Sequence, residues 1–309
     1  MNLFKLFSKK PIIVAHNGGF HADDVFACAT LSLVLGGRCK IIRTRDEKII
    51  NSADFVVDVG GIYNPEINRF DHHQIGGAGI HKNNIPYAAF GLVWKKYGEK
   101  LCGGNIVSDI IEKKVVEPVD GPDNGTSISS SKIDGVHDYV IHNFFASLQP
   151  TWKEDSRSVD REFLRAMGIA KLILEREIKN ATDYIEEENI ILETYKKTAD
   201  KRLLVLSNPF SRFEIVKIVI ENNMPETLFV LYPDDKKGNS WNLAGVRKNL
   251  DDFGLRKDLP SEWAGLTGTT LAEISNVAGA IFCHRKRFLC AAQSKEGALK
   301  LAQQALASE

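Results

Sequence analysis

The sequence predicts an α/β protein with an N-terminal parallel-sheet domain and a smaller C-terminal mixed α/β domain, joined by a long helical connector. In the first half, short apolar runs alternate with helical patterns, which is typical of a parallel sheet covered by helices. A charged stretch without proline, from Ser158 to about Lys201, predicts one or two long helices. Five further strand-length runs and a closing helix at 295–307 follow it.

The individual elements follow from apolar runs and from residues that end helices. Ile12–Ala15 is typical of a buried strand, and Gly36-Gly37 ends the first predicted helix. In the first half we expect strands at 11–16, 40–44 and 54–59, and helices at 22–35, 87–101, 105–117 and 134–147. In the second half we expect strands at 203–206, 228–232, 241–246, 279–283 and 288–291. We place the domain boundary so that the domains span 1–197 and 198–309.

The composition limits the classes of partner. Lys and Arg together number 40, as do Asp and Glu, and this balance argues against a broad basic surface for long duplex nucleic acid. The five cysteines are scattered and fit a reducing compartment. Met1–Lys10 is too short for a signal peptide, and no 18-residue apolar run is present. We therefore expect a cytoplasmic protein without a membrane span. The sequence implies no protein partner, and it leaves the oligomeric state open.

Three of the predicted strands lead directly into histidine or aspartate. Their ends carry His16, Asp58 and Asp71-His72-His73. In open α/β sheets, ligands bind beyond the carboxyl ends of the parallel strands, where these side chains would meet. A single histidine in such a place is more often a core or surface residue, but three clusters together predict a metal site.

The candidate ligands outnumber those that one ion needs. They are His16, His21, Asp23, Asp58, Asp71, His72 and one carboxylate from Asp120 or Asp123. Mixed imidazole and carboxylate ligands suit Mn, Fe, Co or Zn, whereas sites of oxygen alone suit Mg or Ca. Two ions about 3.5–4 Å apart would use the whole set. We predict two divalent metal ions, with manganese favoured and Mg, Co, Fe or Zn as alternatives.

Four motifs together resemble the Myg (melanocyte-proliferating-gene) family of the DHH phosphoesterase superfamily, a family also labelled metal-dependent protein hydrolase. They are His16-Asn-Gly-Gly-Phe-His21-Ala-Asp23-Asp24, Val57-Asp58-Val59-Gly60-Gly61, Arg69-Phe70-Asp71-His72-His73-Gln74 and Asp120-Gly-Pro-Asp123-Asn124-Gly125. The usual first motif of the superfamily, His-x-x-x-Asp-x-Asp, differs from this one, which has an extra residue and His21 in place of the first Asp. The resemblance covers nearly the whole chain. It implies a DHH-type catalytic domain at 1–197 and a substrate-binding domain at 198–309.

The resemblance also implies roles for single residues. One ion would be held by His16, His21 and Asp58. The other would be held by Asp23, Asp58, His72 and a late aspartate, with Asp58 bridging the two ions. Asp71 would orient His72 or its neighbour, as ligating imidazoles commonly require. His73 would face the substrate and donate a proton or hydrogen bond to a phosphoryl oxygen.

The identity of the late aspartate stays open. Asp123-Asn-Gly resembles the Asp-Thr-Gly of the oligoribonuclease branch, whereas Asp120 better fits the end of a strand at Val115–Val119. Asp24 is expected to be a first-turn carboxylate that stabilises its helix rather than a ligand. His81, in a loop, is expected at the surface.

The second domain contains a local basic patch, His284-Arg285-Lys286-Arg287. DHH enzymes commonly contact the substrate's phosphate through a histidine or arginine of a glycine-rich segment, and His284 resembles that position. The Arg-Lys-Arg that follows departs from Myg relatives, which have small residues there. We expect substrate contacts from His284, Arg287 and Arg247, and the alternative is an exposed turn with solvated charges.

The resemblance implies an enzyme that hydrolyses phosphodiesters with a hydroxide activated by two metals. From it we expect an exonuclease that shortens single-stranded RNA or short oligonucleotides from the 3′ end. A small-molecule phosphohydrolase, acting on pyrophosphate or a dinucleotide, is the first alternative, and the zero net charge mildly favours it. A non-catalytic metal-binding protein is the second, although an intact ligand set argues against it. The peptidase of the old family label finds no support, because the chain has no His-Glu-x-x-His motif.

Overall fold

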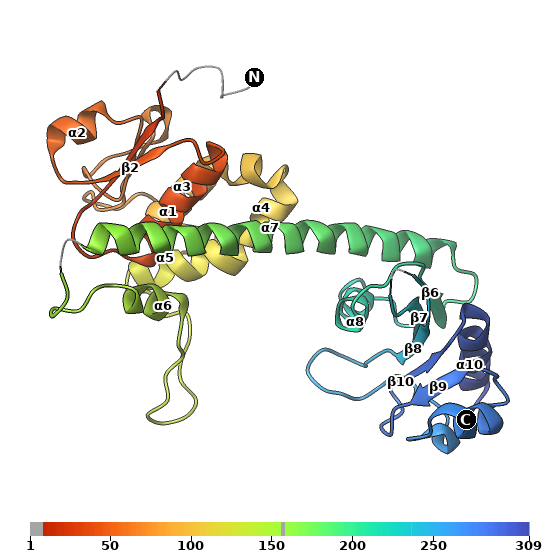
Figure 1. Cartoon of the computed structure of the whole chain (residues 1–309). Helices are drawn as coiled ribbons and strands as arrows, with labels where there is room; N and C mark the ends of the chain where they lie inside the picture. The colour runs from red at the N-terminus through yellow and green to blue at the C-terminus, as the bar shows by residue number, and fades with distance from the viewer. Residues whose placement is uncertain (1–8, 156–157, 236, 309) are drawn as a thin grey trace. The chain divides into compact units, whose positions relative to one another are not determined.

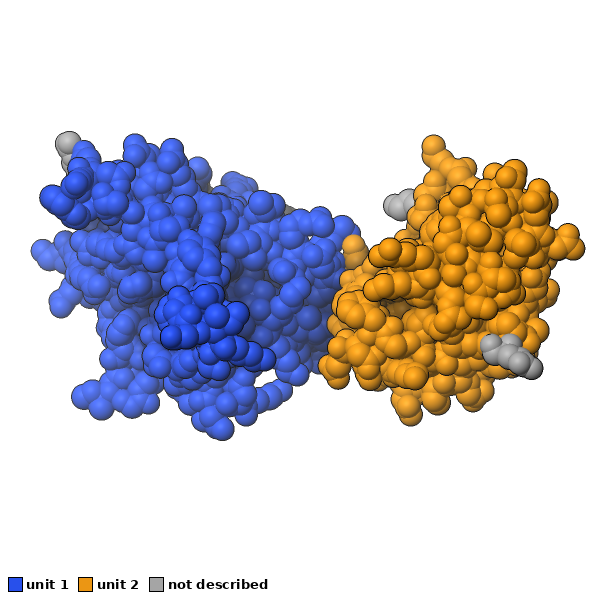
Figure 2. Space-filling model, turned by 90° about the horizontal axis from the view of Figure 1, so that it is seen from below, with its two compact units in different colours: residues 1–182 blue, residues 183–309 orange. Residues whose placement is uncertain are grey.

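The computed structural model describes residues 9–155, 158–235 and 237–308. The expectation about Met1–Lys10 falls mainly on residues 1–8, which lie outside the described residues. The chain divides into two compact units, residues 1–182 and 183–309 (Figure 2). The long charged stretch forms one helix, α7 (Val159–Lys197), and the unit boundary falls within it. The predicted boundary after residue 197 coincides with the C-terminal end of this helix.

The first unit is built on a five-stranded sheet in the order β2-β1-β3-β5-β4. Four strands are parallel and only β4 is antiparallel to its neighbour. The strands are β1 (Ile12–Ala15), β2 (Lys40–Arg43), β3 (Phe55–Val57), β4 (Tyr63–Asn64) and β5 (Arg69–Phe70). The three strands expected here are confirmed, as is the parallel sheet.

Helices cover both faces of this sheet. Successive side chains of a strand point to opposite faces, so neighbouring residues of β1 pack against different helices. Ile13 and Ala15 belong to the core that includes α1 (Ala22–Val34) and α3 (Ala89–Cys102), whereas Val14 packs in a smaller cluster with α2 (Glu47–Ser52). Figure 1 shows these helices around the sheet. The arrangement leaves the carboxyl ends of β1, β3 and β5 at one edge.

A helical run after α3 corrects one expectation. It consists of α4 (Asn105–Ile111), a π-helical turn (Glu112–Val116) and α5 (Glu117–Asp123), so the alternative strand at Val115–Val119 is wrong. Short apolar runs fit either structure, and here Val116 and Val119 are buried at helical spacing. The helix expected at 134–147 is only α6 (Ile141–Ser147), because Gly135 has a φ of 73° that no right-handed helix accepts.

The second unit contains a mixed sheet in the order β6-β7-β8-β10-β9. Its strands are β6 (Leu203–Val205), β7 (Phe229–Pro233), β8 (Trp241–Gly245), β9 (Ala280–Cys283) and β10 (Leu289–Ala292), and all five were expected. Leu231 and Leu243 face a core with α9 (Gly268–Ser275) and α10 (Lys295–Ala307). Val230 and Ala244 face α8 (Arg212–Glu221) and the end of α7. Within the three described ranges, no helix is both long and apolar enough to span a membrane.

Glu187 on α7 provides a test of the second unit's packing. Its Oε1 is buried and accepts no hydrogen bond from a described residue, and burial together with the charge of Glu214 raises the pKa of Glu187 to about 7. Because the folded pKa lies above the unfolded one, ionisation of Glu187 destabilises the fold as the pH rises from about 4.5 past 7. Glu187→Gln should therefore stabilise the protein at pH 8, by roughly 1 kcal/mol once solvent screening of the half-buried group is allowed for.

Urea unfolding at pH 5 and pH 8 measures this effect. At pH 5 the difference between the variant and the wild type should be much smaller, since Glu187 of the folded wild type is then still mostly neutral. Glu186→Gln, at an exposed position of the same helix, serves as the control and should change little at either pH. Equal stabilisation at both pH values would contradict the electrostatic explanation.

Candidate metal centre

The pairing register of the parallel strands β1, β3 and β5 places their carboxyl ends side by side. Ala15 of β1 pairs with Val57 of β3, and Val57 pairs with Phe70 of β5. The next residues along the three parallel strands are His16, Asp58 and Asp71. These side chains therefore leave the sheet at the same edge, as the strand-end pattern predicts.

Asp58 lies at the centre of the cluster. Its Oδ2 is 3.3 Å from Nε2 of His16, while its Oδ1 is 3.3 Å from Nε2 of His72 and 3.3 Å from Nδ1 of His73. Asp58 has a φ of 52°, a left-handed conformation that costs most residues about 1–2 kcal/mol and that aspartate adopts more readily. Burial opposes its ionisation, but the three nearby imidazoles outweigh this and hold the pKa of Asp58 well below its usual range. Asp58 is thus a buried anion with one oxygen near His16 and the other near His72 and His73.

The first turn of α1 adds His21, Asp23 and Asp24 to the same edge. His21 is the N-cap residue, and its backbone N–H donates to Oδ1 of Asp24 at 2.9 Å. The other oxygen of Asp24 lies 3.2 Å from Nε2 of His16. Asp24 therefore caps the helix, as expected, and also contacts His16, which sequence patterns do not reveal.

Asp23 is the least satisfied side chain of the cluster. It is fully buried, and neither carboxylate oxygen accepts a hydrogen bond from a described residue. Burial, followed by the negative charges of Asp58 and Asp123, raises the pKa of Asp23 well above its usual value. A buried carboxylate without a partner is costly unless a cation or a proton compensates it.

The two candidate late aspartates lie in different surroundings. Asp123 is beside the cluster, with its Oδ2 3.4 Å from Nε2 of His72. Asp120 is fully buried elsewhere and accepts hydrogen bonds from Nε2 of His81 at 2.9 Å and from the backbone N–H of Gly91 at 3.0 Å. Of the two candidates that the sequence left open, Asp123 therefore lies beside the cluster, whereas Asp120 is engaged by His81 and Gly91.

His81 is buried, so its expected place at the surface is wrong. Its Nδ1 lies 3.0 Å from Oε1 of Glu112, while Nε2 faces Asp120. Glu112 begins the π-helical turn, so this contact links the turn to the loop that carries His81. His81 thus links its loop to the helical run through contacts with the carboxylates of Glu112 and Asp120.

Asn124 fixes the ring of His72. Its Nδ2 donates to the carbonyl oxygens of Pro86 at 3.2 Å and Asp120 at 2.9 Å, which orients the amide. Its Oδ1 then lies 3.3 Å from Nδ1 of His72 and can accept the N–H of this ring atom. Nε2 of His72, which is buried and has no hydrogen-bond partner among the described residues, is left facing the carboxylates.

Replacing Asn124 by leucine should weaken metal binding about 10–100-fold, as loss of a residue that orients a ligand usually does. Asn124→Asp keeps an acceptor for His72 and should weaken binding less. Titration calorimetry with Mn²⁺ measures both affinities, and urea unfolding in EDTA checks that the variants fold. Unchanged affinity in Asn124→Leu would show that His72 does not need this hydrogen bond.

Asp71 holds His73 rather than His72. Its Oδ1 accepts hydrogen bonds from the backbone N–H of His73 at 3.0 Å and from Nδ1 of its ring at 2.8 Å. Its Oδ2 accepts the backbone N–H of Gly61 at 2.6 Å. The side chain of His73 is 63% exposed, so the ring is anchored on one side and open to solvent on the other.

The donor atoms of the cluster fit divalent cations. Within the cluster around Asp58, three groups offer donor atoms within 4.8 Å of one another, namely His16, His21 and Asp58; Asp58, His72 and His73; and His21, Asp23 and Asp123. Imidazoles combined with carboxylates suit Mn, Fe, Co or Zn. Bound cations would also give partners to the buried oxygens of Asp23 and to Nε2 of His72.

The predicted substrate-binding residues lie in the second unit. His284 and Arg287 belong to a tight turn between β9 and β10, in which the backbone N–H of Arg287 donates to the carbonyl oxygen of His284 at 2.7 Å. The guanidinium of Arg287 also pairs with Asp258 at 2.6 Å. The guanidinium of Arg247 lies 4.4 Å from the ring centroid of Phe253. Contact of these residues with a substrate stays a prediction.

Comparisons with known proteins give consistent matches over nearly the whole chain. Residues 12–306 match a family model named MYG1_exonuc and described as an uncharacterised protein family, UPF0160. The chain is 30% identical to a MYG1 protein of Dictyostelium discoideum over 94% of each chain. It is 30% identical to the MYG1 exonuclease of Mus musculus over 96% of this chain and 85% of the mouse protein. RecJ from Thermus thermophilus, solved with Mn²⁺, aligns over 97% of this chain and 53% of its own, at 12% identity and a TM-score of 0.28, too weak a likeness to support a conclusion.

Proposed function

This chain belongs to the MYG1_exonuc family (UPF0160), and on that premise we propose that it is a metal-dependent hydrolase that acts as an exonuclease on phosphodiester bonds. Membership confirms the resemblance that the four sequence motifs carry. A relative from mouse is named an exonuclease, which favours nucleic acid as the substrate class. The observation that carries the proposal is the buried cluster around Asp58, with its unpartnered carboxylate oxygens on Asp23.

We propose two divalent ions, with manganese favoured. One would be held by His16, His21 and Asp58, and the other by Asp23, Asp58, His72 and Asp123. When bound, such ions lower the pKa of water toward neutrality and offset negative charge on phosphoryl oxygens. Excess negative charge among the ligands supports this assignment, because burial and neighbouring carboxylates both disfavour ionised Asp23.

His73 is proposed to act on the substrate rather than on the ions. Its ring is held by Asp71 and is 63% exposed, so a phosphoryl oxygen can reach it. A histidine in this position can donate a hydrogen bond or a proton as negative charge develops on that oxygen. Contacts from His284, Arg247 and Arg287 remain part of the proposal.

Short single-stranded RNA, shortened from the 3′ end, is the proposed substrate. The zero net charge favours a second candidate, a phosphohydrolase of small anions, because a small anion needs only a local basic patch. A 5′-labelled RNA oligonucleotide with Mn²⁺, Mg²⁺ or EDTA, run beside pyrophosphate, separates the two. A ladder that shortens from the 3′ end and disappears in EDTA is expected. Cleavage of pyrophosphate alone would favour the second candidate, and no turnover with metal bound would contradict both.

A further inference from the structure

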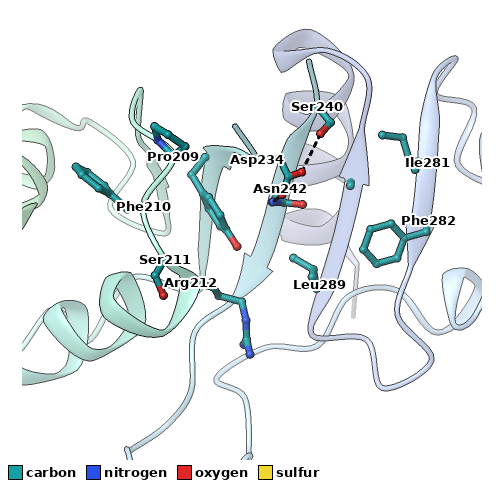
Figure 3. Close-up of a pocket in the computed structure, with 12 residues that line it drawn as sticks. Pro209, Phe210, Ser211, Arg212, Asp234, Ser240, Asn242, Ile281, Phe282 and Leu289 are labelled. Atoms are coloured by element: carbon teal, nitrogen blue, oxygen red, sulfur yellow. Dashed lines mark hydrogen bonds between the residues drawn. The ribbon is translucent and has the colours of Figure 1, made fainter. Parts of the chain in front are cut away.

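The second unit contains a pocket of about 630 Å³ on the α8 side of its sheet (Figure 3). It lies where β7, β8, β10 and β9 meet the loop that leads into α8. None of the predicted substrate-binding residues His284, Arg247 and Arg287 lines it. Pockets of about 300–1,000 Å³ are large enough for a small molecule, so the pocket is a candidate binding site in its own right.

Two buried polar side chains line the pocket without using all of their hydrogen-bonding groups. Tyr232 is 5% exposed and Asn242 is 8% exposed. Nδ2 of Asn242 donates to Oδ1 of Asp234 at 2.9 Å, which fixes the amide. Among the described residues, neither the hydroxyl of Tyr232 nor Oδ1 of Asn242 has a hydrogen-bond partner. The pocket therefore presents a fixed acceptor and a hydroxyl to a ligand.

The side chain of Arg212 adds a cation to the lining of the same pocket. Arg212 begins α8, and its guanidinium lies 4.8 Å from the ring centroid of Phe288. It forms no ion pair with a carboxylate among the described residues. Ser211, the N-cap residue, makes no side-chain cap hydrogen bond, so the first N–H groups of α8 lack that partner. A guanidinium that has no carboxylate partner among the described residues, beside the start of a helix, is suited to a phosphate group.

Part of the remaining wall is apolar, while Asp234 and Ser240 add a carboxylate and a hydroxyl to it. Phe282 and Leu289 line the pocket from the neighbouring strands β9 and β10, as Figure 3 shows. A ligand that matches this pocket needs a flat ring for the apolar walls, polar edges for Asn242 and Tyr232, and an anion for Arg212. Aromatic side chains and amide groups recognise nucleobases in this manner.

We propose that this pocket binds one nucleoside monophosphate unit, with the phosphate at Arg212 and the base against Phe282 and Leu289. The choice of a nucleotide rests on the proposed function. That the ligand should contain a flat ring and an anion is inferred from the side chains that line the pocket. The second unit would then recognise a single nucleotide through residues apart from the basic turn at His284.

Titration calorimetry of the full chain in EDTA tests this with AMP, adenosine and inorganic phosphate. AMP should bind at least about tenfold more tightly than adenosine or phosphate alone, since both parts of the pocket are used. Arg212→Gln should weaken AMP about tenfold and leave adenosine unchanged, whereas Asn242→Ala and Tyr232→Phe should weaken both. Arg202→Gln, which removes an exposed arginine paired with Asp200, is the matched control.

Two outcomes would overturn the proposal. AMP could bind no more tightly than phosphate, or Arg212→Gln and Arg202→Gln could bind AMP equally well. Because EDTA prevents metal-dependent turnover, this result is independent of the hydrolysis assay. An active exonuclease without AMP binding would reject the pocket alone, and AMP binding without RNA hydrolysis would reject the proposed activity alone.

Discussion

Replacing Asp58 by alanine is expected to reduce metal-dependent hydrolysis about 10³-fold or more. Asp58 is the carboxylate that faces both His16 and His72, so its loss would affect both proposed ions. Metal ions typically contribute several kcal/mol to catalysis, and each 1.36 kcal/mol corresponds to a tenfold change in rate. Hydrolysis of the labelled RNA at saturating Mn²⁺ measures the loss.

A second measurement separates loss of metal from loss of fold. Mn²⁺ should raise the melting temperature of the wild type, because a ligand that binds only the folded state stabilises it. Asp58→Ala should lose most of this rise but should still unfold cooperatively in EDTA. Asp109→Ala, at an exposed position of α4, is the control and should match the wild type in both assays. Activity of Asp58→Ala within tenfold of the wild type would exclude Asp58 as a bridging ligand.

The strand-end residues of the site could be predicted because two local signals suffice. A short apolar run indicates a buried strand, and parallel strands place their carboxyl ends at one edge. The observed register, with Ala15, Val57 and Phe70 side by side, then brings His16, Asp58 and Asp71 together.

The partners of those residues could not be predicted, since they depend on packing between distant segments. Asn124 orients His72 from 52 positions away along the chain. The choice between Asp120 and Asp123 required knowing that Val115–Val119 is helical and that His81 is buried against Asp120. A loop histidine has no sequence pattern that distinguishes it from a surface residue.

The secondary-structure elements likewise divide into those that a local sequence pattern predicts and those that it does not. Strands and long helices have enough residues for a periodic pattern, whereas β4 has two residues and α2 has six. Helix α8 was missed because Arg212–Glu221 is rich in isoleucine and valine, which favour strands as much as helices. Elements of this kind are decided by what they pack against, and α8 covers the Val230 and Ala244 side of the second sheet.

Gly91→Ala is expected to lower the free energy of unfolding of the first unit by about 3–5 kcal/mol, measured by urea denaturation in EDTA. A Cβ atom at Gly91 would lie 1.8 Å from Oδ2 of Asp120 and 2.7 Å from Cδ1 of Tyr87. Asp120 cannot move away cheaply, because it is fully buried and its oxygens accept hydrogen bonds from His81 and from Gly91 itself.

Gly168→Ala is the matched control, because Gly168 is exposed on α7 and an added Cβ would meet no heavy atom within 4 Å. This change should stabilise the helix by up to about 1 kcal/mol. Equal effects of the two substitutions would contradict the packing argument. The site should respond as well, since the carbonyl oxygen of Asp120 accepts the amide of Asn124, which in turn orients His72. Gly91→Ala should therefore weaken Mn²⁺ binding even in the molecules that remain folded, although Gly91 contacts no proposed ligand.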